Sequence, residues 1–187
     1  MKHILKDKRY KKLKDFFYWS VRRTFQDLQI QNHAVAEYLT GLLVYFCRTE
    51  MLYSLRNAQN KKLETVVEML LEASQAEEEK ENTSQKRARE IYQHLGDYIM
   101  FITGIFQEYV IRLGCLDFYL REGEIAYRYL FEYDLKHYIP GASLFLELSR
   151  RFEFYSGALH YMRKTFFRDP EPDDPFLDFS RQLANSF

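Results

Sequence analysis

Large apolar side chains recur three and four residues apart along most of this 187-residue chain, and this spacing limits the possible folds more than any other feature. It is the period of an amphipathic helix, which buries its apolar face and turns its polar face to water. Only 7 Gly and 4 Pro occur, which are fewer turn residues than a chain of many short strands requires. The sequence therefore predicts an all-α fold.

The same spacing predicts where the helices lie. A first helix covers residues 8–28, a second follows an N-cap at Asn32, and a third carries Leu63 to Leu71. A fourth helix begins at residue 82 or 83 and ends near Gly114, and a fifth segment covers 117–137, where Gly123 predicts either a kink or a division into two short helices. With one long helix after Pro140, we expect a single-domain bundle of five to six helices, and the 17% aromatic content predicts an aromatic-rich core.

The last predicted helix carries an unbroken heptad seam. Its members are Phe145, Leu148, Phe152, Tyr155, Leu159, Met162 and Phe166, which alternate steps of three and four. Such a seam packs against another helix of the same chain, here the fourth, or against a partner chain. The sequence leaves both possibilities open.

Charge is unevenly distributed in a chain whose formal net charge is zero. We expect one domain over residues 1–187, with a basic arm at 1–10 and an acidic, proline-containing tail at 168–187. The overall balance argues against a whole-domain nucleic-acid binder. The residues that would contact a polyanion, either nucleic acid or an anionic membrane, are Lys8, Arg9, Lys11, Lys12 and Lys14. The alternative is an ordinary solvated face on a helix that docks through its apolar side.

Cysteine content and hydropathy bear on the location of the protein. Cys47 and Cys115 are far apart and form no C-x-x-C pair, which argues against a disulfide framework or a zinc knuckle. The longest apolar stretches reach only about half of the roughly 20 residues that a membrane-spanning helix needs. We therefore expect a cytoplasmic protein without a transmembrane segment.

The residues around position 96 are the densest candidate site. His94 and Asp97 are three apart and share a helix face, where they could bind a metal or tie two helices together. A di-iron bundle requires Glu-x-x-His motifs, and this chain has none. We therefore expect no metal or cofactor. Gly96 and Gly104 stand inside the same helix, where glycine costs up to about 1 kcal/mol, which favours a close approach by another helix.

Two successive stretches together form one pattern of glycine, acidic and aromatic residues. They are His94-Leu95-Gly96-Asp97-x-x-Met100-Phe101-x-x-Gly104-x-Phe106 and, after it, Phe118-Tyr119-x-x-x-Gly123-x-x-Ala126-Tyr127. Together with Leu42-Leu43-x-x-Phe46 and Met69-Leu70-x-Glu72-Ala73, this pattern resembles a family of uncharacterised bacterial all-helical proteins, over about two thirds of the chain. Phe118 departs from it, because the family has tyrosine there. The resemblance implies a bacterial helical domain and no known activity. The resemblance indicates that six residues form a linked cluster, to which we add His94. The candidate cluster is therefore His94, Gly96, Asp97, Gly104, Tyr119, Gly123 and Tyr127.

Three functions follow from these observations. The leading hypothesis is a non-enzymatic module for protein–protein interaction or regulation, expected to be a homodimer, because the heptad seam and the 15 tyrosines suit an interface. The second is a small-ligand-binding or catalytic bundle with a site near Asp97, His94, Tyr119 and Tyr127. The third is polyanion binding through the basic first helix.

Overall fold

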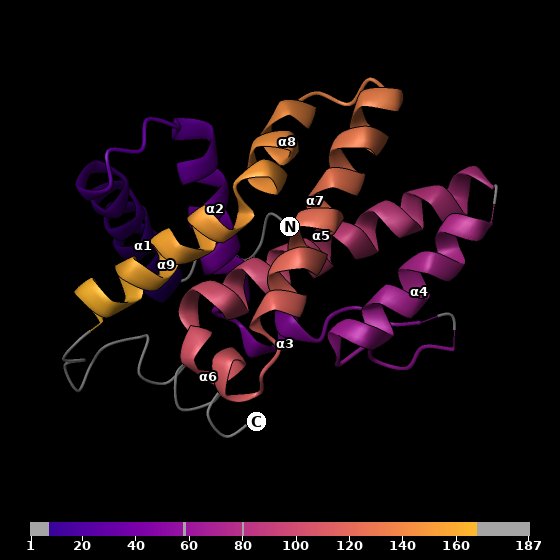
Figure 1. The fold of residues 1–187 in the computed structure, drawn as a ribbon, viewed down its shortest axis with the longest axis horizontal. Helices are drawn as coiled ribbons and strands as arrows, with labels where there is room; N and C mark the ends of the chain where they lie inside the picture. The colour runs from indigo at the N-terminus through magenta and orange to yellow at the C-terminus, as the bar shows by residue number, and fades with distance from the viewer. Residues whose placement is uncertain (1–7, 58, 80, 168–187) are drawn as a thin grey trace. The chain divides into compact units, whose positions relative to one another are not determined.

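The computed structural model describes residues 8–57, 59–79 and 81–167, and their regular structure is helical except for one bridge between Arg56 and Lys62 (Figure 1). This confirms the all-α prediction. The described residues form nine helices rather than five or six. They are α1 (Lys8–Asp27), α2 (His33–Phe46), α3 (Thr49–Leu52), α4 (Val66–Glu78), α5 (Asn82–Ile105), α6 (Gln107–Arg112), α7 (Leu116–Lys136), α8 (Ala142–Arg150) and α9 (Phe152–Phe166).

The count was too low because two predicted helices are each interrupted and one four-residue helix, α3, was missed. The fourth predicted helix stops at Phe106, and the last stops at Arg151, where the backbone leaves the helical region at φ −127° and ψ 31°. Neither position is Gly or Pro. At the second break, the Arg151 guanidinium lies 4.1 Å from the centroid of the Phe154 ring, and the hydroxyl of Tyr155 donates to Glu147.

The chain divides into two compact units, of which the first comprises residues 1–52 and 158–187 and the second residues 53–157. The predicted single domain stays a prediction. The predicted arm and tail lie largely outside the described residues, although residues 8–10 belong to α1. Within the described ranges, no helix is long and apolar enough to cross a membrane.

In the first unit, α1 packs on α2 through large apolar side chains. Phe17 and Val21 of α1 are fully buried, as are Leu39 and Leu43 of α2. The side chain of Asn32 accepts a hydrogen bond from the backbone N–H of Val35, which confirms the predicted N-cap and satisfies a donor that the helix itself cannot pair.

In the second unit, α5 packs against both α4 and α7, and α7 also packs against α8. Most residues between Ile91 and Ile105 are buried, so α5 is surrounded by other elements over its second half. α4 begins with a reciprocal capping box, in which Thr65 accepts from the N–H of Glu68 while the Glu68 carboxylate accepts from the N–H of Thr65. The capping box makes Val66 the first residue of α4, so Leu63, which the sequence placed in this helix, precedes it.

The predicted apolar faces of the last and the third helix have opposite outcomes. The heptad seam is buried in this chain: six of its seven members are buried and Phe166 is partly exposed. The third predicted helix is different, because Val67 and Leu71 are 55% and 59% exposed, whereas Val66, Met69 and Ala73 are buried. Of the periodic apolar residues expected on this helix, Val66 therefore lies in the core as predicted, whereas Val67 and Leu71 do not. The helix is rotated so that the smaller Ala73 lies inside.

Candidate functional site

The predicted cluster lies where α5 meets α7. Tyr127 of α7 is fully buried, and its hydroxyl donates to Oδ1 of Asp97 on α5 over 2.8 Å. A Cβ atom at Gly96 would lie 2.9 Å from Cε1 of the same tyrosine, closer than side-chain carbons approach in proteins. Gly96 is therefore the residue that lets the Tyr127 ring reach Asp97, and the structure brings these three predicted residues together.

Gly123 has the same role one turn earlier on α7. A Cβ atom there would lie 2.2 Å from Cζ of Phe152, whose ring in turn packs on Tyr127 with centroids 5.6 Å apart. Gly123 therefore makes room for a ring of α9, and α7 continues without a break from Leu116 to Lys136, so two short helices do not form. The sequence favoured close helix packing for Gly96, and the structure adds Gly123 to it.

The other three residues of the predicted cluster, His94, Gly104 and Tyr119, also lie on α5 and α7. His94 is 8% exposed and Gly104 is buried, and both are on α5. Tyr119 lies on α7 in a group of phenols. Burial raises its pKa, and the neighbouring Cys115, Tyr109 and Tyr53 raise that pKa further. In the described part of the chain, no group of three or more His, Cys, Asp or Glu side chains could hold a metal ion.

The contact between α5 and α7 extends beyond the prediction. Arg89 of α5 donates from Nε and Nη2 to the two carboxylate oxygens of Asp134 on α7, over 2.6 and 2.8 Å, and Asp134 is 1% exposed. Tyr92 stacks on Tyr129 with centroids 4.1 Å apart. We call this set the α5–α7 seam; its members are Arg89, Tyr92, Gly96, Asp97, Tyr127, Tyr129 and Asp134.

The sequence held a signal for the Arg89–Asp134 pair. Asp134 continues the buried stripe of Gly123, Tyr127 and Leu130 at helical spacing, so its carboxylate had to be buried and needed a donor. The identity of that donor could not be read, because Arg89 is 45 residues away in the chain.

The seam offers little room for a substrate. Tyr127 and Asp134 are buried and bonded within the chain, and the hollows that the structure shows lie elsewhere, along α1 and around the end of α4. Burial also raises the pKa of the Cys47 thiol, which suppresses the reactive thiolate there. The hydrogen bonds of the seam described above join α5 to α7.

The basic residues of α1 have a different environment. Lys11, Lys12 and Lys14 are exposed on the helix, as predicted, while the side chains of Lys8 and Arg9 lie outside the described ones. The same exposed side continues toward the C-terminal end of the helix. We call this surface the α1 face; it comprises Lys11, Lys12, Asp15, Tyr18, Trp19, Arg22, Arg23 and Gln26. This surface could have been predicted from the sequence, because it is the side of the helix opposite the core residues Phe17, Val21 and Phe25.

Comparisons of the chain with protein-family models, with curated proteins and with solved structures find no match. Functional inference therefore depends on the geometry of the described residues. The structure shows the buried α5–α7 seam and the exposed α1 face. It also shows exposed apolar side chains on α4 and α7, namely Val67, Leu71, Phe118 and Ile125.

Proposed function

We propose that this chain is a non-enzymatic helical module that binds a protein partner on the surface formed by α4 and α7. The observation that supports it is a set of large apolar side chains left in water. They are 55%, 59%, 41% and 42% exposed, and we call them the α4–α7 face: Val67, Leu71, Phe118 and Ile125. Exposed apolar side chains that gather on one side of a protein are typical of interfaces.

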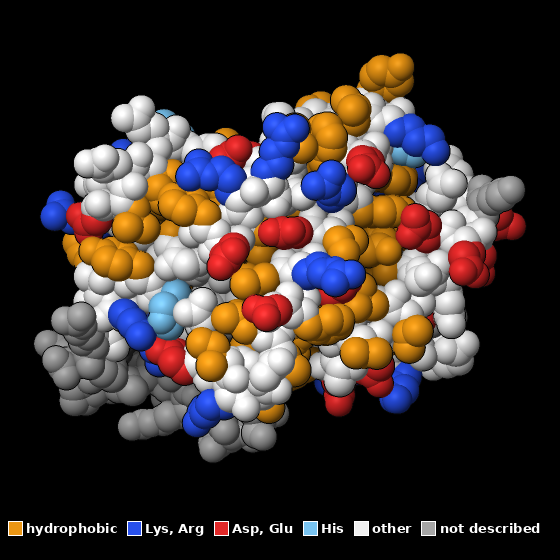
Figure 2. All heavy atoms as spheres, viewed as in Figure 1, with side chains coloured by type: hydrophobic (Ala, Val, Ile, Leu, Met, Phe, Trp, Pro, Cys, Tyr) orange, Lys and Arg blue, Asp and Glu red, His pale blue; other side chains and the backbone are white. Residues whose placement is uncertain are grey.

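The two helices of this face are held beside each other over α5. Tyr92 of α5 donates to the Glu77 carboxylate of α4 and stacks on Tyr129 of α7, so one side chain links all three helices. In Figure 2, hydrophobic side chains gather over α7 and on toward α4. A rigid pair of helices with exposed apolar residues suits a partner helix that lies along them.

Charge indicates the chemistry of the partner. α4 carries four glutamates, Glu68, Glu72, Glu77 and Glu78, and neither Lys nor Arg. A basic amphipathic helix would bury apolar area here and place its Lys or Arg beside these carboxylates. A second copy of the chain would bring two acidic helices together, and the heptad seam that suggested a homodimer is already buried. A partner of different sequence is therefore favoured over self-association.

The test uses a dye-labelled helical peptide of leucine and lysine in a 3.6-residue period, followed by fluorescence anisotropy. We expect the double variant Val67→Ser/Leu71→Ser to weaken binding by at least about tenfold, which corresponds to 1.4 kcal/mol. The matched control is Ile111→Ser/Leu113→Ser, which removes two residues of 53% and 51% exposure elsewhere in the same unit. It should bind like the unmodified protein.

Three outcomes would contradict the proposal. The first is an equal loss in both double variants, and the second is equal binding of a leucine–glutamate peptide with the same apolar face. The third is a concentration-dependent dimer in sedimentation velocity that Val67→Ser/Leu71→Ser abolishes. In that case the occupant is a second copy of this chain.

A further inference from the structure

The helix that carries the α1 face has the largest net positive charge of the helices in the described residues. α1 contains seven Lys or Arg residues and two Asp in 20 residues, a net +5, although the whole chain is formally neutral. Of its two carboxylates, Asp27 pairs with Arg23 over 3.2 Å, and Asp15 lies on the α1 face itself. A concentration of charge on one helix is the electrostatic pattern expected for a polyanion site.

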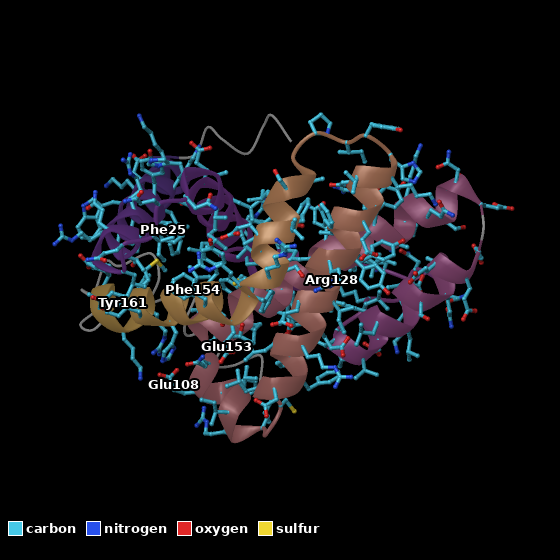
Figure 3. The ribbon with its side chains drawn as sticks, turned by 45° about the horizontal axis from the view of Figure 1, so that its top comes forward. Phe25, Glu108, Arg128, Glu153, Phe154 and Tyr161 are labelled. Atoms are coloured by element: carbon cyan, nitrogen blue, oxygen red, sulfur yellow. The ribbon has the colours of Figure 1, made fainter. Side chains whose placement is uncertain are left out.

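The apolar side of α1 is already occupied, and this decides between two kinds of polyanion. Phe17 and Val21 are fully buried and Phe25, labelled in Figure 3, is 5% exposed. Phe16 packs edge-on against Phe167 from the other end of the chain, with centroids 5.3 Å apart. A helix that lies in a membrane surface inserts its apolar face into the lipid. α1 cannot do so without leaving the core of its unit, so its ligand must bind to the outer, polar side.

Two aromatic rings stand among the charges on that outer side. Trp19 is 55% exposed and Tyr18 is 41% exposed, and with Arg22, Arg23 and Gln26 they line a hollow of about 390 Å³. Each ring makes a contact within its unit. Arg22 donates to the hydroxyl of Tyr18 over 2.8 Å, and Trp19 meets the ring of Phe166 edge-on with centroids 5.0 Å apart. Exposed rings beside guanidinium groups form a stacking platform.

The positions along the helix place charge at both ends of this platform. Lys11 and Lys12 lie toward the N-terminus and Arg22 and Arg23 toward the C-terminus, with the rings between them. Lys11 and Arg22 are separated by about 16 Å along the axis, at 1.5 Å per residue. That length covers several phosphate groups of one strand. Unpaired bases can stack on the rings while the flanking phosphates meet Lys and Arg, whereas the base faces of a duplex are already stacked.

We propose that the α1 face binds single-stranded nucleic acid, with phosphates held by Lys11, Lys12, Arg22 and Arg23 and bases stacked on Trp19 and Tyr18. This function is separate from partner binding on the α4–α7 face. The site also differs from the one that the sequence indicated, because its centre lies at residues 18–23 rather than at residues 8–14.

Trp19 makes the proposal directly testable, because it is the only tryptophan in the chain. Its fluorescence therefore reports on this site alone. The experiment titrates the full chain with a 12-nucleotide oligothymidylate and records tryptophan quenching, with binding followed in parallel by anisotropy of a labelled oligonucleotide. We expect quenching that saturates with binding, and an affinity that falls steeply with salt.

The key variant is Arg22→Gln/Arg23→Gln, and the matched control is Arg121→Gln/Arg128→Gln, which removes the same charge from exposed positions of α7. We expect the first to weaken binding by at least about tenfold and to make the salt slope shallower by about 1.4, for two lost phosphate contacts. The control should bind like the unmodified chain. Trp19→Leu should weaken binding while leaving the salt slope unchanged.

Four results would overturn the proposal: no binding of the single strand, an equal loss of affinity in the two arginine pairs, binding without tryptophan quenching, or a duplex of the same length that binds as tightly. Binding to vesicles of phosphatidylserine in place of the oligonucleotide would assign the α1 face to an anionic lipid surface instead.

Discussion

The α5–α7 seam and the α1 face are built from the same kinds of side chain and use them in opposite ways. In the seam, Arg89 is paired with Asp134 and a tyrosine hydroxyl reaches Asp97, with both acceptors on helices that pack together. On the α1 face, Arg22 and the aromatic residues Tyr18 and Trp19 face water. Polar groups taken out of water must be satisfied by the protein, whereas exposed ones are available to a ligand. On this basis we assign a structural role to the seam and propose a binding role for the α1 face.

The largest expected effect is on the buried ion pair of the seam. Asp134→Ala leaves the Arg89 guanidinium without its bidentate acceptor, and removing one partner of a buried pair costs about 3–5 kcal/mol. Because Arg89 is 21% exposed, water can compensate in part, and we expect a loss near the lower end, about 3 kcal/mol, in urea unfolding. The double variant Arg89→Met/Asp134→Leu should cost less than Asp134→Ala. A loss below 1 kcal/mol for Asp134→Ala would show that the pair is not buried in solution.

The next effect tests the space at Gly123. A methyl group there would lie within 2.2–2.7 Å of three atoms of the Phe152 ring, and Phe152 is fully buried. Gly123→Ala should therefore destabilise the protein by about 2 kcal/mol, since overpacking of about 1–3 kcal/mol exceeds the gain in helix propensity. The control is Gly41→Ala in α2, where nothing lies within 4 Å, and it should stabilise by up to about 1 kcal/mol. Equal changes in thermal stability for the two variants would refute close packing at Gly123.

A smaller effect is expected at the hydrogen bond between Tyr127 and Asp97. Tyr127→Phe keeps the ring and removes the donor, so it should cost about 1.5 kcal/mol, the lower end for a hydrogen bond to a charged group. The ring packing against Phe145 and Phe152 remains. If chemical denaturation shows no change, the hydroxyl bonds to water in solution and the contact contributes nothing to the stability of the seam.

Alkaline titration tests the seam through its tyrosines. Burial, followed by the charge of Glu77, raises the pKa of Tyr129 to about 12 and raises that of Tyr92 as well. Because the folded state holds these protons more tightly than the unfolded chain, the associated stability is present below pH 10 and is lost as pH rises toward 12. Glu77→Gln should shift tyrosinate absorbance at 295 nm to lower pH. An unchanged titration would mean that Glu77 does not face these rings.

The contrast between the two regions also explains what could be read from the sequence. Of the seven positions that periodicity predicted for the heptad seam, all but Phe166 are buried, because burial of a stripe depends on local spacing. The sequence also indicated that Gly96 permits close packing, whereas the same role of Gly123 was not predicted. It could not identify Phe152 or Arg89 as the groups that approach Gly123 and Asp134, because those contacts join residues 29 and 45 positions apart.

The exposed surfaces were harder to predict for a related reason. Val67 and Leu71 match the helical period as well as Val66 and Met69 do, and only the packing of α4 on α5 decides which pair faces water. Arg22 and Arg23 of the α1 face were not selected because the charged run at residues 8–14 is conspicuous in the sequence, whereas these two arginines are interleaved with core residues. Function at a surface depends on what the fold leaves uncovered.

The smallest expected effect on stability completes the comparison. Arg22→Gln/Arg23→Gln removes two exposed charges, and Arg23 has only a solvent-exposed partner in Asp27. Exposed pairs contribute about 0–1 kcal/mol, so we expect a change below about 0.5 kcal/mol in the free energy of unfolding. The same variant should strongly weaken nucleic-acid binding, which Asp134→Ala should leave unchanged under conditions where it is folded. A loss of stability as large as that of Asp134→Ala would mean that the arginines of the α1 face are structural, and the distinction between the two regions would fail.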